Sequence, residues 1–494
     1  MKTSDRFHVV LTRDADSPAI EIDPWIPALS EILVYETQTY NPGDRFPKVE
    51  KHSLYWLADD QKTGYFPVGI LRRVVKFLTK RGYEIEGKDL RDRSRYFPEP
   101  DWSVVHDLRP GQKEVLEAVT SADTGLVVCP TGFGKSFVIT LLVKMYPTLN
   151  FLIVAPGIAE TNNLYNRIIE VEKDTALLNG TSRDDPNHRV VVSTSRSFLK
   201  ADLQKTDIFI FDEAHACGNN QTTQDILNNL RGSRIFGFTA TPKGRSDKAD
   251  RLIEAVFGQK LVDFGYEDAK DAGNVTPIEV QIYSVPGHVE ASKSRFGNAM
   301  TQNRRRFYWR NEIRNRLIKA IACTVPVDEQ LLIMVDTVEH LIRLGAMMPG
   351  YALVCGDGHD LAEEARRMKL DLSGNVLGDT KEVYNELAAK FSKGELKRVI
   401  ATYRWKQAVD FPQLSVLIRA DGAKSPIIST QVPGRLSRLS PDKTTGILVD
   451  FADEFNDSAR RKALARIKSY RENGWKITHM GVFNEQSSSG QETV

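Results

Sequence analysis

One short stretch of the chain combines residue types that bind phosphate groups. Residues 129–136 read Cys-Pro-Thr-Gly-Phe-Gly-Lys-Ser, and small residues let backbone N–H groups surround phosphate oxygens. Apolar runs at 124–128 and 137–145 flank the stretch, which predicts a strand, a loop and a helix whose N-terminus adds partial positive charge. We therefore expect a Walker A loop that binds a nucleoside triphosphate through Pro130, Thr131, Gly132, Phe133, Gly134, Lys135 and Ser136.

An acidic pair follows another apolar run, 207–211. Asp212 would bind Mg²⁺ through water together with Ser136, while Lys135 pairs with the β and γ phosphates. Glu213 would orient and polarise the attacking water. His215 either couples the nucleotide to the Thr-Ala-Thr turn at 239–241 or caps a helix. The alternative for the whole group is an acidic surface turn, which the upstream phosphate loop disfavours.

The second half of the chain carries an arginine pair. Residues 431–438 read Gln-Val-Pro-Gly-Arg-Leu-Ser-Arg, and the spacing places Arg435 and Arg438 on one helical face. Facing the nucleotide of the first half, they would act as arginine fingers that stabilise charge on the transferring phosphoryl group. Hydrolysis would then depend on closure of the two halves. The alternative is a solvated basic helix.

Two series of apolar strands separated by helices position these residues, and they predict two parallel sheets. In such sheets ligands lie beyond the carboxyl ends of the strands, where polar clusters follow each strand of the first series. The expected strands are 126–128, 151–154, 190–193, 207–211 and 234–238, then 331–335, 351–354, 398–401, 415–418 and 446–449. A helix at 68–78 belongs to a small α+β module that precedes them.

Bulk properties set the remaining limits. A length of 494 residues predicts about three domains, and the net charge of +2 leaves the class of partner open. Four scattered cysteines and the absence of a signal peptide or an apolar run of about 20 residues predict a cytoplasmic protein. We expect an accessory domain at 1–105, a first sheet domain at 106–285, a basic aromatic linker or helix at 286–325, a second sheet domain at 326–485 and a disordered tail at 486–494.

In combination and order these motifs resemble superfamily two helicases, over roughly residues 108–451. The resemblance implies two tandem RecA-like parallel-sheet domains, with ATP and Mg²⁺ as cofactors. It implies that Gln112 reads the adenine and that Thr239 and Thr241 couple the nucleotide state to domain movement. Further ATP contacts would be Arg109, Asp410 and Gln431, and contacts to nucleic-acid phosphates would be Pro156, Thr194 and Thr402.

A narrower similarity concerns phage recombination helicases of the UvsW type. Residues 65–71, with Phe77, Leu78, Gly82 and Tyr83, look like the small N-terminal domain of that group. The resemblance implies a monomeric enzyme that remodels forked or branched DNA in recombination, repair or replication, by fork regression and branch migration. It also implies that residues 1–105 contribute to DNA binding.

A basic segment at 303–310 mixes arginines with three aromatic residues. Arg304 and Arg305 would contact DNA phosphates, and the aromatics would stack on bases or form a wedge. The alternative is a linker helix whose aromatics pack on a domain.

The sequence thus predicts an ATP-dependent DNA helicase or translocase. Three alternatives stay open: a duplex translocase that does not separate strands, an RNA-directed remodelling ATPase, and a DNA-binding clamp without turnover. The clamp is suggested by Cys129 and Ala408, which replace residues usual in the family motifs.

Overall fold

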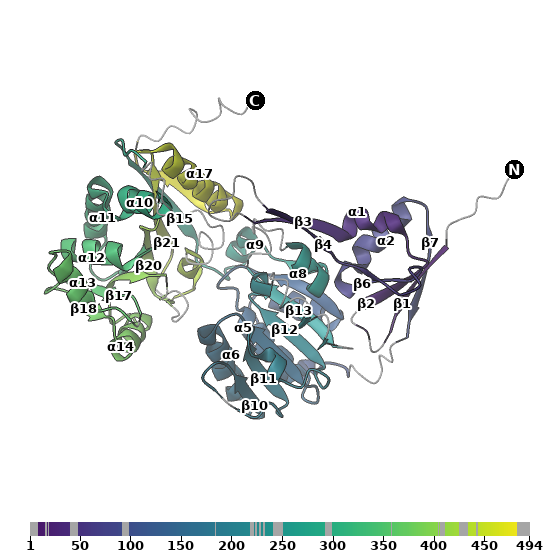
Figure 1. The fold of residues 1–494 in the computed structure, drawn as a ribbon. Coiled ribbons are helices and arrows are strands. Elements are labelled where there is room, and N and C mark those ends of the chain that lie inside the picture. The colour runs from purple at the N-terminus through teal and green to yellow at the C-terminus, as the bar shows by residue number, and fades with distance from the viewer. Residues whose placement is uncertain are drawn as a thin grey trace. The chain divides into compact units, whose positions relative to one another are not determined.

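The computed structural model describes residues 8–14, 17, 19–39, 48–90, 98–182, 184–217, 222, 225–226, 229–230, 233–240, 250–291, 299–356, 358–403, 405, 411–423, 433–440 and 443–481. The chain divides into two compact units (Figure 1). One holds Met1–Pro130 and Gly134–Gly265, and the other holds Thr131–Phe133 and Tyr266–Val494.

The N-terminal part of the first unit is a small α+β module, as the sequence predicts. Its five-stranded sheet has the order β5-β6-β2-β1-β7, with β1 parallel to β7 and antiparallel to β2. A separate hairpin pairs β3 with β4. The strands are β1 (His8–Arg13), β2 (Ala19–Asp23), β3 (Val34–Thr39), β4 (Lys48–Ser53), β5 (Trp56–Leu57), β6 (Gly64–Pro67) and β7 (Glu84–Asp89). The helices are η1 (Pro27–Leu29), α1 (Ser30–Leu33), η2 (Val68–Ile70), α2 (Leu71–Lys80) and η3 (Trp102–Val104).

The rest of the first unit is a seven-stranded parallel sheet of order β10-β11-β9-β12-β13-β8-β14. All five strands expected from the sequence are present, and β10 and β14 extend the sheet at its edges. The strands are β8 (Thr124–Val128), β9 (Phe151–Ala155), β10 (Thr175–Leu178), β11 (Val190–Thr194), β12 (Ile208–Asp212), β13 (Arg234–Thr239) and β14 (Lys260–Asp263). The helices are α4 (Gln112–Thr120), α5 (Lys135–Met145), α6 (Ile158–Val171), η4 (Phe198–Lys200), η5 (Ala214–Cys217) and α8 (Asp250–Phe257).

The second unit is an eight-stranded parallel sheet of order β18-β17-β19-β16-β20-β21-β15-β22. It contains the five expected strands and adds β15, β18 and β22. The strands are β15 (Ile278–Val285), β16 (Gln330–Val335), β17 (Ala352–Val354), β18 (Val376–Gly378), β19 (Arg398–Thr402), β20 (Leu414–Arg419), β21 (Gly446–Asp453) and β22 (Lys476–His479). The helices are α9 (Tyr266–Asp271), α10 (Ala299–Arg304), the π-helix η6 (Arg305–Trp309), α11 (Glu312–Thr324), α12 (Val338–Met347), α13 (Leu361–Arg367), α14 (Lys381–Ser392), η7 (Pro433–Ser437) and α17 (Asp457–Glu472).

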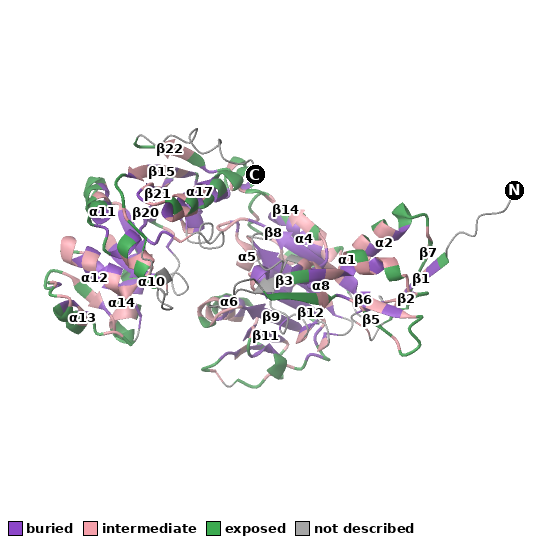
Figure 2. Ribbon diagram, turned by 45° about the horizontal axis from the view of Figure 1, so that its top comes forward, coloured by how far each residue is buried: buried purple, intermediate pink, exposed green. Residues whose placement is uncertain are grey.

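The pattern of buried residues agrees with the parallel-sheet arrangement. The central strands β9, β11 and β12 are buried along their whole length, as in a sheet covered on both faces (Figure 2). The fold class predicted from the sequence, two parallel sheets after an α+β module, is confirmed.

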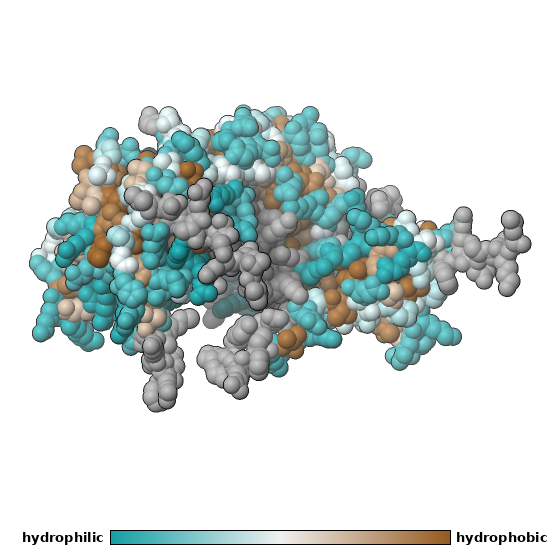
Figure 3. Space-filling view, turned by 90° about the horizontal axis from the view of Figure 1, so that it is seen from above, coloured by the Kyte–Doolittle hydropathy of each residue, from teal (hydrophilic) through white to brown (hydrophobic). Residues whose placement is uncertain are grey.

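The face in Figure 3 is largely hydrophilic, with smaller hydrophobic patches. Among the residues described here, no helix has the length and apolar character needed to cross a membrane.

Candidate nucleotide and nucleic-acid site

The phosphate loop has the backbone that its glycines predict. Strand β8 ends at Val128 and helix α5 begins at Lys135. Gly132 and Gly134 have φ values of 91° and 97°, a region that side chains disfavour. A Cβ on Gly134 would also lie 2.6 Å from the Gln112 amide nitrogen. The loop therefore requires glycine at this position.

Helix α5 holds Lys135 and Ser136 at its first two positions. Most of its later residues are buried, including Val138, Ile139 and Leu142, so packing fixes the helix while its N-terminal N–H groups stay available to an anion. The Lys135 ammonium donates to the carbonyl oxygen of Cys129 at 3.2 Å. The lysine is thus folded over the loop that it is expected to serve.

The acidic pair ends strand β12, whose parallel neighbours include β13 and β9. Burial, and then the charge of Glu213, raise the pKa of Asp212 to about 7, while the Lys135 charge lowers it. Lys135 and Asp212 therefore lie within electrostatic reach of each other. This is the pairing that a magnesium nucleotide needs on its near side.

Glu213 adopts a backbone conformation that is rare outside glycine, with φ of 54°. Its N–H donates to the Asp212 carboxylate at 3.0 Å. Backbone strain of this kind is concentrated at functional sites, which is consistent with the catalytic role expected of Glu213.

His215 connects the acidic pair to the next strand. Its Nδ1 lies 3.2 Å from a Glu213 carboxylate oxygen and 3.2 Å from the Thr239 hydroxyl. The Thr239 carbonyl in turn accepts the N–H of Cys129 at 3.0 Å. Of the two interpretations of His215, this geometry favours coupling to the turn after β13.

Gln112 lies beside the phosphate loop. It is the first residue of α4, is 1% exposed, and accepts the Arg109 N–H at 3.0 Å through its side-chain oxygen. Arg109 and Gln112 are therefore held next to Gly134, where an adenine-reading residue would be needed.

The expected phosphate contacts follow strand ends. In the first sheet Thr194 pairs in register with Ala155, the residue before Pro156, so Pro156 and Thr194 lie on neighbouring strands. In the second sheet Thr402 ends β19 and donates through its hydroxyl to the Cys355 carbonyl at 3.2 Å. Pro156 and Thr194 lie in the polar clusters predicted for the first sheet, and Thr402 lies at the carboxyl end of a strand of the second sheet.

The arginine pair lies in and just after η7, a 3₁₀ segment. Arg435 and Arg438 are both half-buried, and the Arg435 guanidinium lies 5.2 Å from the centre of the Phe411 ring. Their role towards a nucleotide stays a prediction. Three further expected site residues, Thr241, Asp410 and Gln431, lie outside the described residues, as does the 486–494 tail.

The basic aromatic segment is part of the core of the second unit. Phe307, Tyr308 and Trp309 are 2%, 1% and 6% exposed, so the alternative in which they pack on a domain is confirmed and base stacking by them is wrong. Arg304 forms an ion pair with Asp336 at 2.7 Å, and Arg305 one with Glu339 at 3.1 Å. Contact of these two arginines with DNA stays a prediction.

Glu160 is an acidic residue near the site for which the sequence predicts no role. It lies in the first turn of α6, directly after β9, and its charge adds to the forces that raise the pKa of Asp212. The available signal was its position: an acidic residue just beyond the carboxyl end of a central strand.

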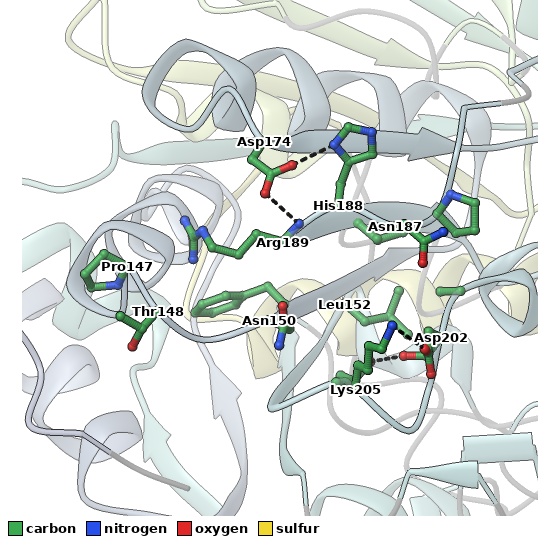
Figure 4. Close-up of a pocket in the computed structure, with 15 residues that line it drawn as sticks. Pro147, Thr148, Asn150, Leu152, Asp174, Asn187, His188, Arg189, Asp202 and Lys205 are labelled. Atoms are coloured by element: carbon green, nitrogen blue, oxygen red, sulfur yellow. Dashed lines mark hydrogen bonds and ion pairs between the residues drawn. The ribbon is translucent and has the colours of Figure 1, made fainter.

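A cavity of about 560 Å³ lies at the other end of the seven-stranded sheet, where its strands begin. In Figure 4 Asp174 points toward His188 and the backbone of Arg189, while Lys205 approaches Asp202. Its lining residues lie just before β9, β10, β11 and β12 and in the first residues of β9 and β11. The cavity is thus separate from the phosphate loop and the acidic pair.

Residues 105–244 match the family model "Type III restriction enzyme, res subunit". A putative helicase of Frog virus 3 is 27% identical over 216 residues, which span 40% of this chain and 46% of that protein. The ATP-dependent DNA helicase uvsW of Enterobacteria phage T4 is 22% identical over 465 residues, 86% of each chain.

The chain resembles superfamily two helicases of the UvsW type. Its fold is also similar to that of S. cerevisiae Dbp5 bound to RNA and ADP BeF3, with a TM-score of 0.51 and 14% identity over 75% of this chain and 90% of that one. These relationships support an ATP-hydrolysing helicase that remodels nucleic acid.

Proposed function

We propose that the chain is an ATP-driven DNA helicase or translocase that remodels forked or branched DNA, by fork regression and branch migration in recombination, repair or replication. The observation that carries the proposal is the convergence of Lys135, Asp212 and Glu213 at one edge of a parallel sheet. The alignment with a phage DNA helicase, at 22% identity over 86% of this chain, supports DNA as the substrate.

The residues of the first sheet domain fit a magnesium nucleotide. Gly134 leaves no room for a side chain beside the loop, and the buried Asp212 carboxylate lies in the field of Lys135. Ser136 and Asp212 would hold Mg²⁺, which supplies charge neutralisation on the phosphates. Gln112 reads the base and Lys135 holds the β and γ phosphates.

The remaining site residues would carry out ATP hydrolysis and couple it to movement along DNA. Glu213 orients the attacking water and accepts its proton. His215 passes the state of this carboxylate to Thr239. Arg435 and Arg438 stabilise the transferring phosphoryl group when the two sheet domains close, with Asp410 and Gln431 as further nucleotide contacts. DNA phosphates are contacted by Pro156, Thr194, Thr402, Arg304 and Arg305. Because phosphate contacts carry no sequence information, the protein binds DNA with weak sequence preference.

ATP hydrolysis by the full chain, measured with and without forked DNA, tests the proposal. Glu213→Gln and Lys135→Ala should each lower DNA-stimulated hydrolysis about 100-fold or more, with DNA affinity changed only a few-fold. Lys205→Ala, at the opposite edge of the sheet, is the matched control. Full hydrolysis by the Glu213 or Lys135 variant would overturn the assignment. A comparison of single strand, duplex, fork, four-way junction and RNA–DNA hybrid identifies the substrate.

A duplex translocase that does not separate strands is the second candidate. It is favoured by the match of residues 105–244 to the restriction-enzyme model. Strand displacement from a fork supports the helicase. Displacement of a third strand from a triplex, without separation of a duplex, supports the translocase instead.

A further inference from the structure

Helix α2 of the N-terminal module has an unusual distribution of charge. Its sequence, Leu71–Lys80, contains four cationic residues and no acidic residue. Arg72, Lys76 and Lys80 recur every four residues and are all exposed, whereas Val74 and Leu78, on the other side of the helix, are 0% exposed. Because an α-helix rises about 1.5 Å per residue, Arg72, Lys76 and Lys80 are spaced about 6 Å apart along the helix axis. We call Arg72, Lys76 and Lys80 the α2 stripe; Figure 2 shows exposed positions along this helix.

The neighbouring cations are neutralised and the α2 stripe is not. Arg73 is paired with Glu254, and Arg81 is paired with Glu31 and lies over the Phe77 ring. Within the part of the chain that the structure describes, none of the three stripe residues has an ion pair or hydrogen bond from its side chain. The stripe is therefore a row of positive charge available to an external anion.

Helix α2 belongs to a module that shares a packed helix, α8 (Asp250–Phe257), with the first sheet domain. Helix α8 serves two cores at once: Leu252 and Ala255 pack into the core of the N-terminal module, while Ile253, Val256 and Phe257 pack into that of the first sheet domain. The module is thus joined to the ATP-binding domain by a shared helix.

A hydrogen-bonded ion pair and a close backbone contact reinforce this joint. Arg73 donates from Nε to Glu254 at 2.9 Å and makes a second contact from Nη2 to the other carboxylate oxygen. Gly69 lies so close to the Glu254 carbonyl that a side chain would not fit. At the far end of β1, Arg13 pairs with Asp123, which directly precedes β8, at 3.4 Å. The α2 stripe therefore keeps a fixed position on the domain that carries the phosphate loop.

We infer that the α2 stripe binds backbone phosphates of the nucleic-acid substrate, held at a fixed place on the ATP-binding domain. The inference rests on the proposed function and deepens it, because it names the surface of the accessory module that makes the contact. Lysine and arginine contacts to phosphate are independent of sequence, as branched substrates of any sequence require.

Other anionic partners fit the helix less well. Helices that bind membrane surfaces present an apolar face to the lipid, but the apolar side of α2 is buried in its own domain. Protein interfaces centre on aromatic or arginine anchors in apolar surroundings. Beside the stripe, Arg73 is paired and Thr79 is polar, while Val75 and Phe77 are half-buried against the module's own core.

The test measures the salt dependence of DNA binding by the full chain. Fluorescence anisotropy with a forked DNA gives the dissociation constant between 50 and 200 mM KCl. In the triple variant Arg72→Ala/Lys76→Ala/Lys80→Ala, the slope of log affinity against log salt should fall by about 2 to 3, because each lost phosphate contact removes about 0.7 to 0.9. Affinity at 100 mM salt should fall roughly 10- to 100-fold. Unstimulated ATP hydrolysis should not change.

A matched control is Arg167→Ala/Lys173→Ala/Lys205→Ala, which removes one arginine and two lysines from exposed positions of the first sheet domain. Its slope should equal that of the unmodified protein. Equal slopes for the two triple variants would overturn the inference while leaving a DNA-stimulated ATPase, and hence the proposed function, intact. An unmodified protein that neither binds DNA nor hydrolyses ATP would defeat the proposed function itself. Loss of binding to phosphatidylserine vesicles with unchanged DNA binding would assign the stripe to membranes and overturn the inference.

Discussion

The side chain of His215, in η5 just after β12, contacts that of Thr239 at the end of the neighbouring strand β13, with 3.2 Å between Nδ1 and the hydroxyl oxygen. Thr239 is 0% exposed, so its hydroxyl is directed by its protein partners rather than by solvent. The same residue accepts the N–H of Cys129 through its carbonyl, so we expect a shift at the acidic pair to reach the start of the phosphate loop. Hydrolysis and movement are therefore expected to be separable at Thr239.

Thr239→Val tests this separation. Valine keeps the shape of threonine but removes the hydroxyl that faces His215. We expect DNA-stimulated hydrolysis to fall less than fivefold and strand separation per ATP consumed to fall at least tenfold, because the nucleotide contacts remain while the link to the turn is lost. Fork unwinding and phosphate release, measured on the same preparation, give the ratio.

Thr206→Val is the control for this variant, since Thr206 is also buried and donates to a carbonyl, at the opposite edge of the sheet. Equal losses of hydrolysis and unwinding in Thr239→Val would show that the hydroxyl serves catalysis alone.

The ion pair between Arg73 and Glu254 should contribute measurably to the joint between the N-terminal module and the first sheet domain. Both side chains are less than one third exposed, and the contact is bidentate. A double-mutant cycle with Arg73→Ala and Glu254→Ala should give a coupling free energy of about 1 kcal/mol in urea unfolding. A coupling free energy of zero would mean that packing of α8 alone holds the joint. The exposed pair Lys113 and Glu117 is the comparison, with an expected coupling of about 0.3 kcal/mol.

The sequence predicts the strands that are buried on both faces and misses those at sheet edges. β9 and β12 are uninterrupted apolar runs, so periodicity identifies them without tertiary information. β14 and β22 are four-residue edge strands with exposed polar ends, and their pairing depends on a sheet that already exists. The sequence does not predict β15, which lies in the last residues of the expected first sheet domain (106–285) but pairs in the second sheet.

The residues of the candidate site also divide into those that the sequence identifies and those whose surroundings it does not predict. The phosphate loop and the acidic pair are local motifs, so their residues are identified correctly from spacing. The packing of Phe307 and Tyr308 against Phe455 joins segments about 150 residues apart, and composition cannot distinguish it from a stacking platform. Helix α8 carries apolar residues at 252, 253, 255, 256 and 257, but the sequence does not show which of them face which of the two cores.

A buried ionic cluster should dominate the stability of the second unit. Arg314 and Arg466 both contact Asp453, at 2.9 and 3.2 Å, and all three side chains are 0% exposed. Asp453→Asn would leave the buried Arg314 without its carboxylate partner, while Arg466 keeps Asp450, at an expected cost of about 3–5 kcal/mol in unfolding free energy. Glu312→Gln, which removes an exposed pair with Arg316, should cost less than about 0.5 kcal/mol. Similar losses in the two variants would show that water reaches the cluster.

Acid should destabilise the protein through His340, which is 0% exposed and packs beside Arg314. Burial, and then the Arg314 charge, lower the pKa of His340 from 6.5 to about 3. Between these values the unfolded chain binds one proton more than the folded chain, so the free energy of unfolding decreases as pH falls. The decrease is about 1.4 kcal/mol per pH unit for one group, or roughly 2–3 kcal/mol between pH 6.5 and 4.5.

His340→Gln should remove this dependence, because glutamine does not titrate and can still donate to Asn315, which now lies 3.0 Å from the ring. His359→Gln is the control, since His359 is half exposed and faces Glu364. Urea unfolding at half-unit steps of pH gives the slopes. Carboxylates such as Asp421 and Asp450, whose pKa values the buried arginines hold below the usual range, lose their stabilising charge only at lower pH. Asp212, whose pKa burial raises to about 7, also titrates above pH 4.5, but it does so in both proteins. The difference in slope between the unmodified protein and His340→Gln therefore reports the histidine, and equal slopes would show that this imidazole is protonated in the folded protein.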